Sequence, residues 1–245
     1  MRTIWVLFLA IVLLLFGYIA LGIFWIVGKF NPHKADLLHQ SFAMAIFRAV
    51  LKFTGAKLTV IGKENVPKDE AVLYVANHRG IFDVLLSYPE CPGLTGYISK
   101  DSIDKVPAVR LWMRRLHCLF LDRDDIKQGL KVILTAIDYV KQGISIFVFP
   151  EGTRNKNQED SADVAPFKDG TFKIAQKTGC KVIPVAITGT AEILENQFPW
   201  MRRGPVIIQY GTPITLEELS PEDRKHPGEY FRKAVATMLE SHKSL

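Results

Sequence analysis

A histidine and an aspartate carry the clearest chemistry in this sequence. His78 follows the apolar run AVLYVA, and Asp83 closes the segment NHRGIFD. A reversal of the chain between them would let the Asp83 carboxylate accept a hydrogen bond from one imidazole nitrogen, leaving the other nitrogen as a positioned base. The alternative is an N-capping aspartate beside an incidental surface histidine. Since the sequence holds no GxSxG motif, the nucleophile is expected to be a hydroxyl of the substrate.

A second polar group follows another apolar run. ISIFVF stops at Pro150 and delivers Glu151, Gly152, Thr153 and Arg154 to a strand end, where ligands bind in open α/β sheets. Arg154 can donate two hydrogen bonds to a phosphate, and Gly152 allows close approach of the backbone. Glu151 could orient Arg154 or accept from a substrate hydroxyl. A structural ion pair in a loop is the alternative.

The elements that must position these residues begin after Gly55, where short apolar runs alternate with helical stretches. This pattern predicts an α/β fold, a mostly parallel sheet of about seven strands flanked by helices. Strands are expected at residues 57–62, 71–76, 95–99, 118–122, 144–149, 182–187 and 205–210. Helices are expected at residues 106–116, 125–141, 169–179 and 229–242.

The N-terminal region is more apolar. Residues 3–28 hold no charged side chain, and a helix of that length exceeds the roughly 30 Å hydrocarbon core of a bilayer. A signal peptide is the alternative, but the apolar run continues past the small residues at 20–22. We predict a membrane-anchoring helix pair in residues 1–55 and a catalytic domain in residues 56–245.

The second helix of this pair is predicted to start near Asp36 and to be amphipathic. Its apolar stripe packs either on the globular domain or in the bilayer interface, and the sequence leaves both open. The stripe consists of Leu38, Phe42, Ile46, Ala49 and Phe53, with His39 off it.

The composition limits the partners. The 245-residue chain has a formal net charge of +6, which indicates an anionic partner, and the apolar N-terminus favours a bilayer over nucleic acid. Cys91, Cys118 and Cys180 are odd in number and widely spaced, with no CxxC, which argues against a disulfide framework or a thiolate metal site. Lys29 and Lys34 place the catalytic domain on the cytoplasmic face.

Four ordered blocks resemble the 1-acyl-glycerol-3-phosphate acyltransferase family, within the glycerolipid acyltransferase superfamily. The resemblance covers about residues 57–215. NHRGIFD is similar to the NHxxxxD block, CLFLDR to the block that ends in Asp122 and Arg123, FPEGTR to the third block, and residues 183–185 to the fourth. Four blocks in order are far more specific than any one of them.

The resemblance implies an acyltransferase in which His78 is the general base and Asp83 its partner. It implies transfer of a fatty acyl group from acyl-CoA or acyl-carrier protein to the sn-2 hydroxyl of 1-acyl-sn-glycerol-3-phosphate (lysophosphatidic acid), giving phosphatidic acid at a bacterial-type cell membrane. Lys100, at the end of TGYIS, is expected to bind the substrate phosphate together with Arg154. Arg123 is a secondary candidate. The reaction that the resemblance implies requires no metal and no cofactor.

The sequence departs from the family pattern in places. Gly80 stands where many members have serine, and Cys118 stands where the second block commonly opens with glycine. We expect Cys118 to be a packed residue and not an acyl carrier. Lys168 matches a recurrent lysine of the family but could equally be solvated. Residues 155–165 are longer and more acidic than usual, as expected of a solvated insertion or a flap.

Several functions remain open. The acceptor could be glycerol-3-phosphate or another lysolipid, the enzyme could be a hydrolase in which His78 activates water, or the protein could be a non-catalytic lipid-binding protein. Residues 198–205, FPWMRRGP, combine aromatic and basic side chains suited to lipid headgroups. They either touch the membrane near the mouth of the site or pack on the sheet.

Overall fold

The sheet of this protein has seven strands in the order β1-β7-β6-β2-β5-β3-β4. The computed structural model describes residues 2–157, 160 and 162–244. Each strand end lies within two residues of its predicted position, because the apolar runs were short and clearly bounded. The strands are β1 Lys57–Ile61, β2 Leu73–Ala76, β3 Thr95–Lys100, β4 Leu119–Leu121, β5 Ser145–Val148, β6 Val182–Thr188 and β7 Pro205–Tyr210.

The strands are parallel except at one junction. β6 pairs with β7 in antiparallel orientation, while β1 runs parallel to β7. The block from β6 through β2, β5 and β3 to β4 is parallel throughout. The carboxyl ends of β2 and β5 therefore lie side by side, which brings the start of NHRGIFD next to FPEGTR. The predicted α/β class with a mostly parallel sheet is confirmed.

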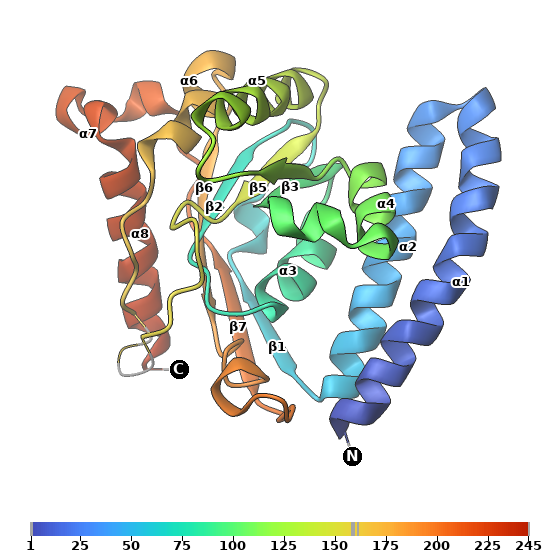
Figure 1. Ribbon diagram of the computed structural model, residues 1–245. Helices are drawn as coiled ribbons and strands as arrows, with labels where there is room; N and C mark the ends of the chain where they lie inside the picture. The colour runs from blue at the N-terminus through green and yellow to red at the C-terminus, as the bar shows by residue number, and fades with distance from the viewer. Residues whose placement is uncertain (1, 158–159, 161, 245) are drawn as a thin grey trace.

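Helices cover both faces of the sheet (Figure 1). Side chains alternate along β2, so that Leu73 and Val75 join the core under α5, α6 and α8, whereas Tyr74 and Ala76 join the core on the side of α2. The α-helices are α1 Arg2–Phe30, α2 Pro32–Thr54, α3 Phe82–Ser87, α4 Pro107–Arg115, α5 Ile126–Lys141, α6 Lys173–Thr178, α7 Pro221–Lys225 and α8 Pro227–His242. Short 3-10 helices are η1 Lys63–Asn65, η2 Tyr88–Glu90, η3 Asp101–Lys105, η4 Asp169–Phe172, η5 Glu195–Gln197 and η6 Leu216–Glu218.

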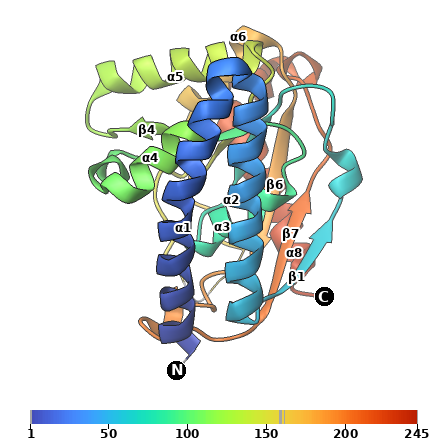
Figure 2. The same ribbon diagram turned by 90° about the vertical axis from the view of Figure 1, so that its right-hand side faces the viewer.

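α1 and α2 form a helical hairpin beside the sheet domain (Figure 2). Asn31 separates the helices and caps α2 by accepting a hydrogen bond from the backbone N–H of Lys34 at 2.9 Å, and Pro32 occupies the first turn. α2 thus begins four residues before the predicted start at Asp36, because Asn31-Pro32 starts the second helix as well as ending the first.

The buried face of α2 is not the predicted apolar stripe. Phe53 is exposed and the other stripe residues are only half-buried, whereas His39 is almost completely buried and its Nδ1 lies 2.7 Å from the carbonyl oxygen of Ala35. α2 contacts α1 on one side and α3, α4 and η2 on the other. With neighbours on two sides, its buried positions no longer form one stripe. The buried residues are Ala35, His39, Gln40, Ala43, Val50, Leu51 and Thr54.

α1 is long and apolar enough to cross a membrane. Most of its large side chains are exposed, including Trp5 at 64% and Phe16 at 62%. Its inner face packs on α2 and on Trp112 of α4, which together with Ala20 and Leu21 forms a small apolar cluster. Trp112 is therefore buried where α4 meets α1.

Candidate active site

The turn between β2 and α3 joins His78 to Asp83. His78 Nδ1 lies 2.6 Å from Asp83 Oδ2, and this oxygen also accepts hydrogen bonds from the backbone N–H groups of Arg79 at 2.7 Å and Gly80 at 2.9 Å. The Asp83 side chain is completely buried and lies in the first turn of α3. Convergence of three donors fixes the carboxylate oxygen, and with it the orientation of the imidazole. The chain reversal that the sequence required is present.

The His78 ring is also held by an aromatic neighbour. It stacks on Phe149, which follows β5, with 4.1 Å between ring centroids and 19° between the planes. The side chain remains 17% exposed, and its Nε2 makes no hydrogen bond within the described part of the chain. With Asp83 on Nδ1, Nε2 is the nitrogen that can accept a proton.

Glu151 braces the backbone of this turn. One carboxylate oxygen accepts a hydrogen bond from the backbone N–H of His78 at 2.6 Å, and the other accepts from the N–H of Ala165 at 3.0 Å. Burial raises the pKa of Glu151 to about 7, while these two hydrogen bonds and the nearby His78 act in the opposite direction. Glu151 therefore orients the His78 backbone, a role that the sequence did not suggest, while Arg154 pairs with Glu195 instead of Glu151.

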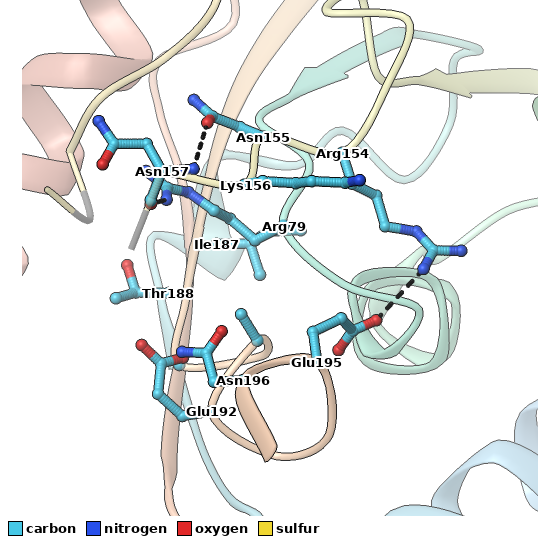
Figure 3. Close-up of a pocket in the computed structure, with 12 residues that line it drawn as sticks. Arg79, Arg154, Asn155, Lys156, Asn157, Ile187, Thr188, Glu192, Glu195 and Asn196 are labelled. Atoms are coloured by element: carbon cyan, nitrogen blue, oxygen red, sulfur yellow. Dashed lines mark hydrogen bonds and ion pairs between the residues drawn. The ribbon is translucent and has the colours of Figure 1, made fainter. Parts of the chain in front are cut away.

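A pocket of about 240 Å³ lies on the β6 side of His78. In it Arg154 and Glu195 reach toward each other, with 3.5 Å between Nη1 and Oε1 (Figure 3). Glu195 belongs to the β6–β7 loop, which we define as residues 189–204. The pocket combines cations, carboxylates and amides, as suits a polar ligand. Its lining includes Arg79, Arg154, Lys156, Thr188, Glu192 and Glu195.

Glu195 is a site residue that sequence reasoning missed. Its Oε1 accepts a hydrogen bond from the backbone N–H of Ile81 at 2.7 Å, while its Oε2 is buried without a partner among the described residues. A Cβ on Gly80 would lie 2.7 Å from this Oε2. A side chain at position 80 would have to displace the Glu195 carboxylate, so glycine leaves the space that this carboxylate occupies. The departure at Gly80 was the only signal, and it named no partner.

Arg79 is a second residue that was missed. Its guanidinium donates hydrogen bonds to the backbone carbonyl oxygens of Asn157, Asp160 and Asp163, the last two at 2.7 and 2.8 Å. The backbone N–H of Asn155 in turn donates to the carbonyl of His78 at 2.8 Å. The segment after FPEGTR is thus attached to the residue next to the catalytic candidate, which is more than a solvated insertion would show.

The glycine of FPEGTR has a conformation that favours glycine. Gly152 has φ = 76°, and a Cβ there would lie 3.1 Å from Nζ of Lys168. The Lys168 side chain thus lies against this turn, although the residue is exposed. Thr153 is exposed at the same turn and makes no hydrogen bond through its side chain in the described structure.

The three predicted phosphate ligands are not assembled together. Arg154 pairs with Glu195 on the β6 side of β5, whereas Lys100 ends β3 and Arg123 follows β4, on the other side of β5. Lys100 and Arg123 are exposed, and their side chains have no hydrogen bond or ion pair in the described part of the chain. A phosphate held by Arg154 and Lys100 would have to bridge the end of β5, next to His78.

Cys118 is packed, as expected. Its side chain lies in the core on the α2 side of the sheet, and burial raises the pKa of its thiol to about 12. A thiol with so little thiolate is a poor nucleophile.

Comparison with known proteins points in the same direction. The model of the acyltransferase family matches residues 57–188. A 1-acyl-sn-glycerol-3-phosphate acyltransferase of Borreliella burgdorferi is 29% identical over 207 residues, 83% of this chain and 80% of the relative. Its counterpart in Saccharomyces cerevisiae is 27% identical over 234 residues, 94% of this chain and 73% of the relative.

A solved structure shares the whole architecture. The crystal structure of the 1-acyl-sn-glycerophosphate acyltransferase PlsC from Thermotoga maritima superimposes with a TM-score of 0.85. The two chains are 26% identical, and the match covers 100% of this chain and 95% of the other. The likeness therefore includes the helical hairpin as well as the sheet domain.

Proposed function

We propose, because this chain belongs to the acyltransferase family, that it transfers a fatty acyl group to the sn-2 hydroxyl of 1-acyl-sn-glycerol-3-phosphate and so forms phosphatidic acid. The relatives named above are acyltransferases for this acceptor. The observation that carries the proposal is the 2.6 Å contact between His78 Nδ1 and Asp83 Oδ2. The next residue, Arg79, lines the pocket together with Arg154.

The mechanism assigns the proton transfer to His78. Nε2 takes the proton of the glycerol hydroxyl as its oxygen attacks the carbonyl carbon of an acyl thioester, either acyl-CoA or acyl-carrier protein. The tetrahedral intermediate collapses with cleavage of the C–S bond, and the imidazolium returns the proton to the leaving thiolate. Asp83 stabilises the imidazolium while it exists. These steps use the side chains of the protein and two substrates, with neither a cofactor nor an acyl-enzyme.

The acceptor phosphate is bound by Arg154 together with Lys100, with Arg123 as the secondary ligand. Arg154 supports this role because it is half-exposed in the pocket and its only ion pair in the described structure is the 3.5 Å contact with Glu195. The Lys100 side chain is exposed and has no hydrogen bond or ion pair with any of the described residues. Gly152 and Thr153 form the backbone turn that presents Arg154, and Glu151 holds the backbone of His78 at the end of the neighbouring strand β2.

One assay separates this function from the alternatives. Purified protein is incubated with palmitoyl-CoA, with lysophosphatidate, glycerol-3-phosphate or no acceptor, and both thiol release and lipid products are followed. Thiol release that requires lysophosphatidate and yields phosphatidate is expected. Release without any acceptor would indicate a hydrolase, a product only from glycerol-3-phosphate would change the acceptor, and no release at all would indicate a lipid-binding protein.

The catalytic assignment is tested by His78→Ala. We expect kcat to fall by roughly 10²–10⁴-fold, the usual contribution of a general base. The matched control is His226→Ala, which changes an exposed histidine at the start of α8 and should leave kcat unchanged. Near-normal turnover of His78→Ala would rule out this mechanism.

We further propose that residues 1–55 attach residues 56–245 to the cytoplasmic face of a cell membrane. The exposed apolar side chains of α1 support attachment, since burying such surface in lipid is favourable by about 25 cal/mol per Å². The test is vesicle flotation of the full chain. Trp5→Ser together with Phe16→Ser, both on the exposed face of α1, should reduce the bound fraction, and recovery of all the protein with vesicles would contradict the role of this face.

A further inference from the structure

Two aromatic side chains of the β6–β7 loop point away from the protein. Phe198 is 76% exposed and Trp200 is 59% exposed. The backbone beneath them is well fixed, because the N–H of Trp200 donates to the carbonyl of Gln197 and that of Arg202 to the carbonyl of Ile193, each at 2.9 Å. The aromatics are therefore presented outward by an ordered turn.

The loop is continuous with the apolar face of α1. The backbone N–H of Met201 donates a hydrogen bond to Thr3 Oγ1 at 2.8 Å, and both views show the segment before β7 beside the N-terminal end of α1 (Figures 1 and 2). Ile4 and Trp5, the next residues of α1, are 63% and 64% exposed. Exposed apolar surface therefore extends from the helix to the loop.

Basic side chains border this surface. Arg2, Arg202 and Arg203 are all exposed, and a Cβ on Gly55 would lie 3.1 Å from Cβ of Arg203 and 3.8 Å from Cζ of Arg2. Two of these arginines therefore meet where α1 begins and α2 ends. Aromatic residues next to arginines are the combination that the headgroup region of an anionic bilayer accommodates.

The same loop forms one wall of the pocket. Glu195 and Asn196 line it, and Phe198 follows two residues later. A surface that holds Phe198 would consequently also hold the wall of the pocket, so the loop connects the substrate site to the exposed apolar surface.

We infer that Phe198 and Trp200 insert into the interfacial region of an anionic bilayer, with Arg202 and Arg203 on the headgroups, and hold the pocket against the membrane. The acceptor then enters from the bilayer without crossing water. This contact adjoins the apolar face of α1 but is made by the β6–β7 loop. Only the identity of the acceptor rests on the proposed function.

The test compares two acceptors with the full chain. Phe198→Ser with Trp200→Ser should raise the apparent KM for long-chain lysophosphatidate in phosphatidylcholine–phosphatidylglycerol vesicles by about tenfold, given the apolar surface withdrawn from lipid. The KM for a short-chain, monomeric lysophosphatidate should stay within about twofold, since that acceptor arrives through water. Phe198→Leu with Trp200→Phe should restore the vesicle KM.

A matched control removes exposed apolar residues elsewhere. Ile126 and Leu130 of α5 are 89% and 56% exposed and lie on the other face of the sheet, so Ile126→Ser with Leu130→Ser should change neither KM. An equal rise in KM for both acceptors in the loop variant would show that the loop acts only as a wall of the pocket and does not contact the bilayer. An unchanged KM for both acceptors would also overturn the inference. So would an effect seen only with a cell membrane extract and not with pure vesicles, which would indicate a protein partner.

Bilayer contact is also measured apart from catalysis. Trp200 emission, taken as the difference between the wild type and Trp200→Phe, should be quenched by brominated phospholipids. Absence of quenching would overturn the inference even if transfer is active. Quenching without any transfer to lysophosphatidate would instead preserve the membrane contact and reject the proposed function.

Discussion

The turn at residues 77–83 and the β6–β7 loop lie at the same site but differ in burial and in how firmly they are held. The turn is buried and fixed, with three donors on Asp83 Oδ2 and Glu151 on the His78 backbone. The loop meets the turn through Glu195, whose second carboxylate oxygen has no partner in the described structure, and it exposes Phe198 and Trp200. The difference suggests a division of work, in which the turn sets the chemistry and the loop sets access of the acceptor.

The largest effect is therefore expected inside the turn, from Asp83→Asn. The amide keeps one acceptor oxygen but loses the charge that stabilises the imidazolium, so kcat should fall by roughly 10²–10⁴-fold with little change in KM. Steady-state kinetics with palmitoyl-CoA and lysophosphatidate measure the split. Asp125→Asn, a matched change at the exposed N-cap of α5, should leave kcat unchanged. A change in KM with an unaltered kcat would contradict the proposal that the turn sets the chemistry and the loop sets access of the acceptor.

Arg154 lies at the junction of the two regions, and its loss should act mainly on binding. Arg154→Ala removes a charge-assisted contact, so the KM for lysophosphatidate should rise by about ten- to a hundredfold, with a smaller change in kcat. The effect should be absent with a phosphate-free acceptor. Lys177→Ala, an exposed cation on α6, serves as the control. Equal losses for acceptors with and without phosphate would show that Arg154 supports the turn instead.

The two regions also differ in how well the sequence predicted them. The strands and the His78–Asp83 contact were predictable because apolar runs mark strand ends and a short loop brings neighbouring residues together. Glu195 was not, since it lies more than a hundred residues from Gly80 and reaches it only through the antiparallel return of β7 beside β6. The sequence showed that Gly80 was unusual, but only the fold shows why.

Two further differences between expectation and structure, in α2 and at Glu151, have a similar origin. The apolar stripe predicted for α2 assumed one buried face, but α1 and the sheet domain cover the helix from two sides, and His39 becomes buried with them. For Glu151, which follows β5, one of the two roles left open by the sequence was to orient Arg154, as would be expected if charged neighbours in FPEGTR paired with each other. Instead two backbone N–H groups from distant segments take up its oxygens. Tertiary neighbours decided both cases.

The brace within the turn predicts a pH dependence of stability. Burial raises the pKa of Glu151 from 4.5 to about 7, so between these values the folded protein binds more protons than the unfolded chain. Stability contributed by Glu151 is therefore present at low pH and is lost as pH rises through this window. The glutamine side chain in Glu151→Gln cannot titrate, so the wild type loses stability over this window and the variant does not. The difference in unfolding free energy between the two proteins should therefore fall by on the order of 1–3 kcal/mol as pH rises through the window.

Denaturant unfolding of both proteins at several pH values measures this difference. Glu64→Gln, at an exposed glutamate of η1, should leave the pH dependence unchanged. If the wild type and Glu151→Gln kept a constant difference in unfolding free energy across the window, the Glu151 carboxylate would not titrate there, and the turn would be held by a permanently charged group.

The smallest effect tests the contact between the two regions. Glu195→Gln keeps an oxygen to accept from the Ile81 N–H but removes the negative charge near Arg154, so the acceptor phosphate no longer has to displace a carboxylate. Because partly exposed ion pairs contribute little, the KM for lysophosphatidate should fall only about three- to fivefold, with kcat within about twofold. Burial raises the pKa of Glu195, with the nearby Asp83 acting in the same direction and the Ile81 hydrogen bond and Arg154 opposing it.

Glu195→Ala separates charge from support. It removes the same charge but leaves the Ile81 N–H without its acceptor, and the N–H belongs to the turn that carries Asp83. This variant should therefore lower kcat as well, whereas Glu195→Gln should not. Glu192→Gln, at an exposed carboxylate on the same loop, is the matched control for charge alone. A fall in kcat with Glu195→Gln would place Glu195 with the catalytic turn, and the boundary between chemistry and access would then lie within the loop.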